Sequence, residues 1–120
     1  MERTMLSSAA APAGGPYSPG LVLGDTVYLA GQTGAGETIE EQTEDALGKV
    51  ASLLAEAGCS LADVVSCLVH LTDLSTFDRY NAVYERHFSE PRPVRTTVGA
   101  ALLGGAMIEV TAVARRPGPA

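Results

Sequence analysis

Basic residues, cysteines and long apolar runs are all scarce in this sequence, and each shortage argues against a class of function. Lys and Arg together number 8, against 14 Asp and Glu, so the formal net charge is −6 at pH 7. The sequence pI is ≈ 4.7. Proteins that bind nucleic acid usually have a basic face, so this balance argues against a polyanion partner. Its plainest consequence is solubility.

The two cysteines, Cys59 and Cys67, do not have the spacing of a metal site. Residues 1–15 are rich in Ala, Pro and Gly but contain no long apolar segment of a secretory signal. No run approaches the ~18–20 apolar residues of a membrane span. These absences predict a protein with reduced thiols that acts in the cytoplasm without a membrane partner.

Length and composition predict a single domain over residues 1–120. Hydrophobic residues make up 46% of the chain and charged residues 18%, which is enough apolar material for a core. Periodicity predicts the order β-β-α-β-α-β-β after an irregular first 20 residues. The expected strands are 21–23, 26–30, 64–72, 94–99 and 107–114, and the expected helices are 38–57 and 75–88.

Local signals define the first hairpin and the first helix. Gly24 and Asp25 form the hairpin turn, with Gly24 at the position that favours a positive φ. Thr38 followed by Glu41 is a capping box, and Gly58 ends the helix. The interpretation is an α/β (α+β) fold in which two helices cover one face of a mixed sheet. The strands are apolar on both sides, so we expect the other face to meet further subunits.

Two charged residues lie inside β-rich, otherwise apolar segments. Arg95 follows Pro93-Val94, and Glu109 follows Met107-Ile108. If the two strands pair, both side chains can face one cleft, where Arg95 grips a carboxylate and Glu109 moves a proton or places a water. The alternative from spacing alone is a cross-strand salt bridge or an interface ion pair.

Of four further polar residues, Tyr17 and Asn81 have both a functional and a structural interpretation. Tyr17, fixed by prolines in Gly-Pro-Tyr-Ser-Pro-Gly, can present its hydroxyl to a pocket or pack a loop onto the core. Asn81 is a poor helix former in the middle of a helix, where it can bind a ligand or bond to a neighbouring segment. His70 and His87 fit no catalytic pattern and are interpreted as structural or surface residues.

Taken together, these segments resemble the reactive-intermediate deaminase family, RidA/YjgF, over nearly the whole chain. The similarity lies in five motifs in the family's order, namely residues 15–20, 29–32, 71–84, 93–98 and 108–114. The resemblance implies a chorismate-mutase-like fold and a homotrimer with sites between subunits. It also implies hydrolysis of reactive 2-enamine and 2-imine acids, such as 2-aminoacrylate and 2-iminopropanoate, to 2-oxo acids and ammonia. No metal or organic cofactor is implied.

Site roles follow from the resemblance, residue by residue. Arg95 is expected to bind the substrate carboxylate and Glu109 to act on water as acid and base. Tyr17, Ala30, Gly31 and Asn81 are expected to line the substrate pocket.

The chain departs from the family pattern at three places. Ala30 replaces a serine, Thr111 replaces a second glutamate, and the loop between Gln32 and Thr38 is short. Two alternatives therefore stay open: a pathway-specific enzyme acting on another unstable enamine or imine, and a ligand-binding trimer without turnover. The family has also been linked to ribonuclease activity, which the net charge of −6 disfavours.

Overall fold

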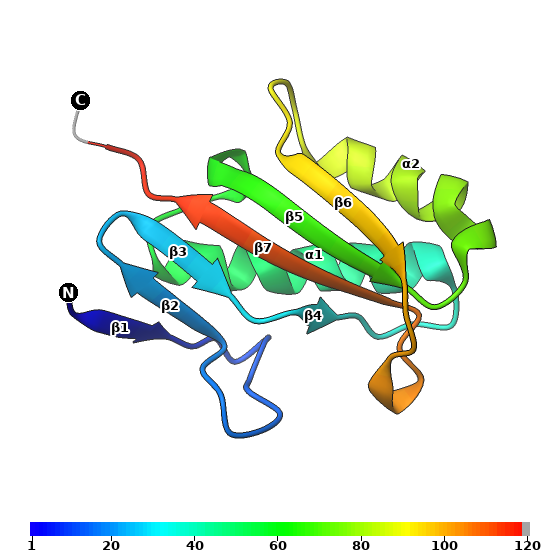
Figure 1. The fold of residues 1–120 in the computed structure, drawn as a ribbon, viewed down its shortest axis with the longest axis horizontal. Helices are drawn as coiled ribbons and strands as arrows, with labels where there is room; N and C mark the ends of the chain where they lie inside the picture. Colours follow the sequence, from blue (N-terminus) through cyan, green and yellow to red (C-terminus); the bar gives the residue numbers. More distant parts are fainter. Residues whose placement is uncertain (119–120) are drawn as a thin grey trace.

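The computed structural model describes residues 1–118 and places them in one seven-stranded sheet with two α-helices behind it (Figure 1). Along the sheet the strands follow the order β1-β2-β3-β7-β5-β6, and the short β4 pairs with β7. The β5–β6 pair is parallel and the other pairs are antiparallel. The strands are β1 (Arg3–Leu6), β2 (Gly20–Leu23), β3 (Thr26–Leu29), β4 (Gln32–Thr33), β5 (Val64–Leu71), β6 (Val94–Gly99) and β7 (Ile108–Arg115).

The helices begin and end where local chemistry requires it. Helix α1 (Ile39–Glu56) starts with the predicted capping box, in which Thr38 Oγ1 accepts from the Glu41 amide and Glu41 Oε1 accepts from the Thr38 amide. Gly58, with φ at +73°, follows its C-terminus. Helix α2 (Phe77–His87) is followed by Pro91 and Pro93, which cannot continue a helix.

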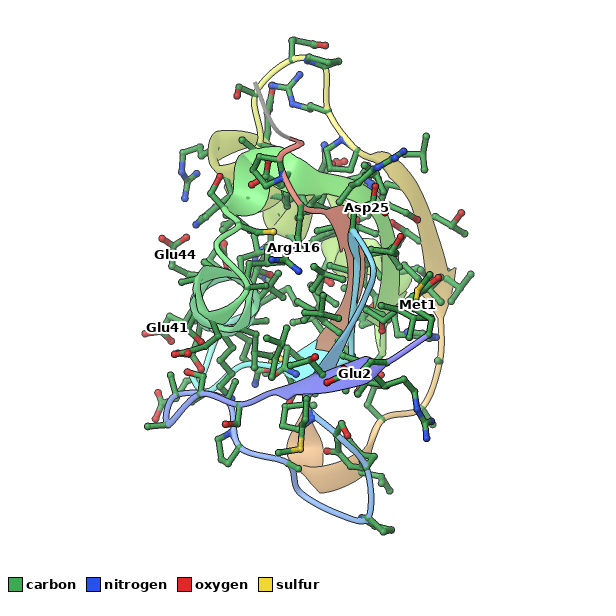
Figure 2. The ribbon with its side chains drawn as sticks, turned by 90° about the vertical axis from the view of Figure 1, so that its left-hand side faces the viewer. Met1, Glu2, Asp25, Glu41, Glu44 and Arg116 are labelled. Atoms are coloured by element: carbon green, nitrogen blue, oxygen red, sulfur yellow. The ribbon has the colours of Figure 1, made fainter. Side chains whose placement is uncertain are left out.

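The core lies between the helices and one face of the sheet. Alternate residues of the central strands point into it, so Cys67, Val69 and Leu71 of β5 are buried, as are Ile108, Val110, Ala112 and Ala114 of β7. Helix α1 buries Leu47, Val50, Leu53 and Leu54 against them. Seen edge-on, α1 lies to one side of the sheet with Glu41 and Glu44 pointing away from it (Figure 2).

The opposite face of the sheet, called here the open face, is covered by no element of the described chain and is rich in apolar side chains. Strand register aligns Met5, Leu21, Tyr28 and Val113 in one row, with Ser66 and Val94 beyond them. Met5, Tyr28 and Val94 are 62%, 48% and 71% exposed. Leu68 and Val98 of the same face are exposed as well. This is the uncovered apolar face that the sequence predicted.

The predicted α+β class and the two-helix arrangement are confirmed, and two details were wrong. Residues 3–6 form β1, although they were expected to be irregular, and residues 32–33 form the short β4. The strands 94–99 and 107–114 do not pair with one another, because β5 lies between them. In the part of the chain that the structure describes, no helix is both long and apolar enough to cross a membrane.

Candidate active site

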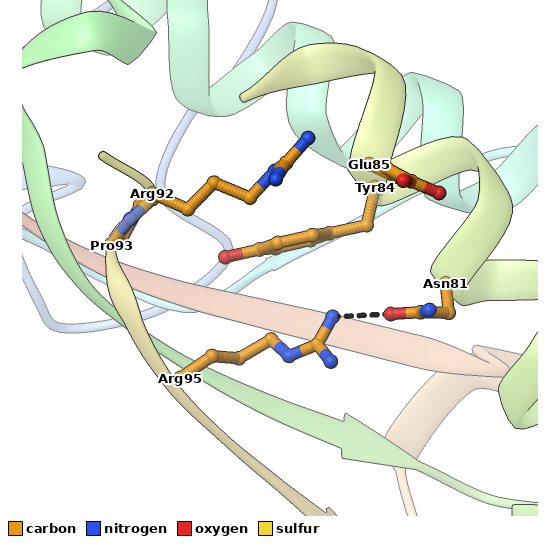
Figure 3. Close-up of a pocket in the computed structure, with 6 residues that line it drawn as sticks. All are labelled: Asn81, Tyr84, Glu85, Arg92, Pro93 and Arg95. Atoms are coloured by element: carbon orange, nitrogen blue, oxygen red, sulfur yellow. Dashed lines mark hydrogen bonds between the residues drawn. The ribbon is translucent and has the colours of Figure 1, made fainter. Parts of the chain in front are cut away.

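Arg95 lies on β6 and faces helix α2. Its Nη1 donates to Asn81 Oδ1 at 2.7 Å, and its guanidinium carbon lies 4.6 Å from the centre of the Tyr84 ring (Figure 3). Tyr80 and Phe77 also place ring centres within 5.6 Å of that carbon. One hydrogen bond and three aromatic rings therefore hold the cation in place. The structure brings Arg95 and Asn81 together, as expected if both serve one site.

A pocket of ≈ 370 Å³ opens at this guanidinium, between α2 and the start of β6. That volume suits a small molecule. Arg92 also lines the pocket, and in Figure 3 the Tyr84 ring lies between Arg92 and Arg95. Arg92 Nε donates to the Phe88 carbonyl and its Nη1 donates to Glu90 at 2.7 Å. The sequence analysis did not single out Arg92; a second arginine three residues before Arg95 was the available signal. The other lining residues are Asn81, Tyr84, Glu85 and Pro93.

Neutral groups lie beneath the Arg95 guanidinium. Burial, together with the adjacent Cys67 thiol, raises the pKa of the Tyr84 hydroxyl well above its usual range. Burial likewise raises the pKa of the Cys67 thiol and that of the Tyr80 hydroxyl. The Tyr80 hydroxyl is hydrogen-bonded to Thr97 Oγ1 at 2.7 Å. At neutral pH these groups carry no negative charge, so they do not compete with an incoming carboxylate for Arg95.

Glu109 lies on the open face of the sheet, against the backbone of Gly31. A Cβ added at Gly31 would lie 2.6 Å from Glu109 Cδ, so the carboxylate fills the space that glycine leaves. In the strand register Glu109 is flanked by Thr33 of β4 and His70 of β5. About a third of its side chain is exposed. The structure thus brings Gly31 and Glu109 into contact.

Tyr17 and Ala30 belong to the segments next to Gly31. Ala30 donates its amide to the Pro19 carbonyl, which ties the Tyr17-containing loop to the end of β3. Tyr17 is 53% exposed, and its hydroxyl accepts a hydrogen bond from the Gly14 amide at 3.1 Å. The hydroxyl is therefore oriented by its own loop on an exposed part of the chain.

Arg95 and Glu109 do not meet within one chain. The register pairs Arg95 with Cys67, whose side chain is in the core, whereas Glu109 pairs with His70 on the open face. The two charges therefore point to opposite faces of the sheet. Because β5 lies between β6 and β7, Arg95 and Glu109 are two strand spacings apart, and they are also offset by three residues along the strands. Their Cα atoms are therefore roughly 14 Å apart. The condition for a shared intrachain cleft, pairing of these two strands, is not met, and neither is the alternative of an intrachain salt bridge.

The remaining candidates are accounted for by local contacts. His87, near the end of α2, has Nε2 3.3 Å from Glu44 Oε2 of α1, and its Nδ1 contacts the Val83 carbonyl. Among residues 1–118, no group of three or more His, Cys, Asp or Glu side chains could hold a metal ion.

Comparisons with known proteins agree on one family. A family model described as Endoribonuclease L-PSP matches residues 8–116. A RutC family protein of Saccharolobus solfataricus is 38% identical over 111 residues, covering 85% of this chain and 88% of that protein. The human 2-iminobutanoate/2-iminopropanoate deaminase is 34% identical over 122 residues, covering 93% and 89%. The crystal structure of RidA from the Antarctic bacterium Psychrobacter sp. superposes with a TM-score of 0.90 at 35% identity, covering 93% of this chain and 98% of that one.

Proposed function

The chain belongs to the Endoribonuclease L-PSP family, also known as YjgF/RidA, and on that premise we propose that it hydrolyses reactive 2-enamine and 2-imine acids to 2-oxo acids and ammonia. The proposed substrates include 2-aminoacrylate and its tautomer 2-iminopropanoate. The observation that carries the proposal is the Arg95 guanidinium, held by Asn81 and Tyr84 at the mouth of a small pocket. A cytoplasmic location stays a prediction.

Arg95 binds the substrate carboxylate in this proposal. Asn81 occupies Nη1, which leaves other N–H groups of the planar guanidinium to donate to a carboxylate. The Tyr84 ring fixes the plane of the guanidinium. Because the cation is already oriented before substrate arrives, little conformational entropy is lost on binding.

Glu109 activates water in the same proposal. The imine carbon is electrophilic, so a water oriented by the carboxylate adds to it, with the carboxylate accepting the proton. The nitrogen takes that proton from the carboxylate, and the proton of the new hydroxyl group then passes to the nitrogen as well, so ammonia leaves as the carbonyl forms. For the enamine tautomer, protonation of the terminal carbon first gives the imine. Positioning supplies most of the acceleration, because the reaction needs no covalent intermediate with the protein.

The two halves of this site come from two copies of the chain. Arg95 and Glu109 face opposite sides of one sheet, so a complete site needs Arg95 of one subunit next to Glu109 of a neighbour. The exposed apolar row on the open face supports such an assembly, since a large apolar surface of this kind marks an interface. We propose a closed homotrimer with the sites between subunits. Tyr17, Ala30 and Gly31 then complete the Glu109 half of each pocket.

The experiment measures pyruvate and ammonia release from 2-aminoacrylate generated in situ, with the buffer-only rate as baseline. Native protein should accelerate the release, whereas Arg95→Ala should not, although its oligomeric state and thermal unfolding stay native. Loss of assembly in Arg95→Ala would assign Arg95 a structural role instead. Absence of acceleration by native protein would reject this substrate and leave a different unstable imine or a binding-only trimer.

A mixture of two inactive variants tests whether the site is divided. Arg95→Ala and Glu109→Gln are unfolded together and refolded, with each variant treated alone as control. If each site is shared between subunits, a random mixture should recover about a quarter of the native activity. A site is then complete wherever a subunit with an intact Arg95 lies next to one with an intact Glu109. A site within one chain regains none, so a mixture as inactive as its components would reject the divided site.

A further inference from the structure

His70 is the side chain that the sheet places directly beside Glu109. The two residues are register partners on β5 and β7, and both point to the open face. His70 Nδ1 lies 4.0 Å from Glu109 Oε1. The other register partner of His70 is Val98 on β6, and the neighbouring side chains on this face, Leu68, Thr96 and Thr111, are not titratable. Among these residues Glu109 is the one charged group beside the imidazole.

The ring nitrogen facing Glu109 has no other partner. Within residues 1–118, His70 Nδ1 is enclosed and makes no hydrogen bond. An enclosed ring nitrogen without a partner is unfavourable, so buried polar atoms are nearly always paired. A shift of about 1 Å by the Glu109 side chain would bring the two atoms to hydrogen-bond distance. That shift is open to a side chain that is a third exposed.

We propose that His70 positions Glu109 for the reaction by donating a hydrogen bond from Nδ1 to Oε1. The inference rests on the proposed function and extends it by one residue. Gly31 bounds the carboxylate and His70 would bond to Oε1, which leaves Oε2 for the substrate water. His70 touches neither substrate nor water and acts only through Glu109. A residue needed for packing alone would have no use for a nitrogen at this point.

Two substitutions separate positioning from packing. His70→Phe keeps a flat aromatic ring of similar size but removes the donor, whereas His70→Asn keeps a donor close to the place of Nδ1. With 2-aminoacrylate generated in situ, we expect kcat of His70→Phe to fall roughly 10-fold to 100-fold with little change in KM, and His70→Asn to recover most of that loss. Native kcat in His70→Phe, or an equal loss in both variants, would overturn the inference.

A second measurement does not depend on turnover. The ¹⁵N shifts of the His70 ring report which nitrogen carries the proton, and that choice is set by the ring's hydrogen bonds. The native protein should show a protonated Nδ1 at neutral pH, and Glu109→Met, which removes the acceptor, should lose that signature. An unprotonated Nδ1 in the native protein, or no change in Glu109→Met, would overturn the inference whether or not 2-aminoacrylate is a substrate. If the native protein shows the expected tautomer but has no deaminase activity, the proposed function is rejected and the hydrogen bond from His70 to Glu109 is not.

Discussion

A single methyl group at Gly31 would test how closely the activity depends on the place of Glu109. The Cβ of Gly31→Ala would lie 2.6 Å from Glu109 Cδ, 2.8 Å from Cγ and 2.9 Å from Oε1. Carbon atoms in contact normally lie about 3.5–4.0 Å apart, so the carboxylate must retreat by about 1 Å. Gly31 is not among the residues with a positive φ, so its backbone accepts alanine without strain.

The expected result is a loss of turnover without a comparable loss of stability. The atoms that must move are the end of a partly exposed, flexible side chain, so the free energy of unfolding should fall by less than about 1 kcal/mol. A misplacement of about 1 Å at a reacting group can lower the rate by about 100-fold. We expect kcat for 2-aminoacrylate to fall roughly 10-fold to 100-fold. KM should stay close to native, because Arg95 binds the substrate carboxylate and is not disturbed. Initial rates of pyruvate release and urea unfolding measure the two quantities.

Gly48→Ala provides the matched control. A Cβ at Gly48, inside α1, would meet no atom of residues 1–118 within 4 Å apart from its chain neighbours and the nearby backbone of its own helix. Alanine there should stabilise the protein by up to about 1 kcal/mol and leave kcat unchanged. Native kcat in Gly31→Ala would refute the argued position of Glu109. A raised KM with unchanged kcat would instead make Gly31 a wall of the carboxylate pocket.

Two further predictions concern parts of the chain away from Glu109. Gly34→Ala drives its Cβ into the Gln42 backbone carbonyl, which cannot move aside as a side chain can. The free energy of unfolding, measured by urea denaturation, should therefore fall by about 2–4 kcal/mol. Stability equal to that of the native protein would contradict the close packing of this loop on α1. Burial raises the pKa of the Cys67 thiol, so little thiolate forms at neutral pH. A thiol reagent should therefore label Cys67 slowly in the native protein and fast in denaturant, as read by mass spectrometry. Rapid labelling of the native protein would show that the core opens there.

The parts of the fold that the sequence predicted well are those with strong local signals. The capping box at Thr38 and the stop at Gly58 define α1, and both were readable because they are contiguous in sequence. The strand β1 has one buried residue in four, and β4 has only two residues, so neither presents a periodic pattern. Their positions are set by pairing with β2 and β7, which is a tertiary effect.

The strand order is the feature of the fold that the sequence analysis left open, although the sequence did contain a clue to it. A strand, a helix and a second strand in succession, here β5, α2 and β6, usually form a parallel pair of neighbouring strands. That rule places β6 beside β5 and turns Arg95 toward α2. Asn81 was predicted as a possible pocket residue, and its bond to Arg95 follows from this crossover. His70 had no sequence signal of its own, since its role depends on the register between β5 and β7.

The separation of Arg95 and Glu109 has a physical advantage for the proposed chemistry. If both lay on one face of neighbouring strands, the carboxylate would pair with the guanidinium and compete with the substrate's own carboxylate. The sheet prevents that pairing in each chain, because one side chain lies under α2 and the other on the open face. Each half is also oriented by its own chain, Arg95 by Asn81 and Tyr84, and Glu109 by the close approach of Gly31. In the proposed homotrimer, assembly of these prearranged halves would set the distance between the two charges.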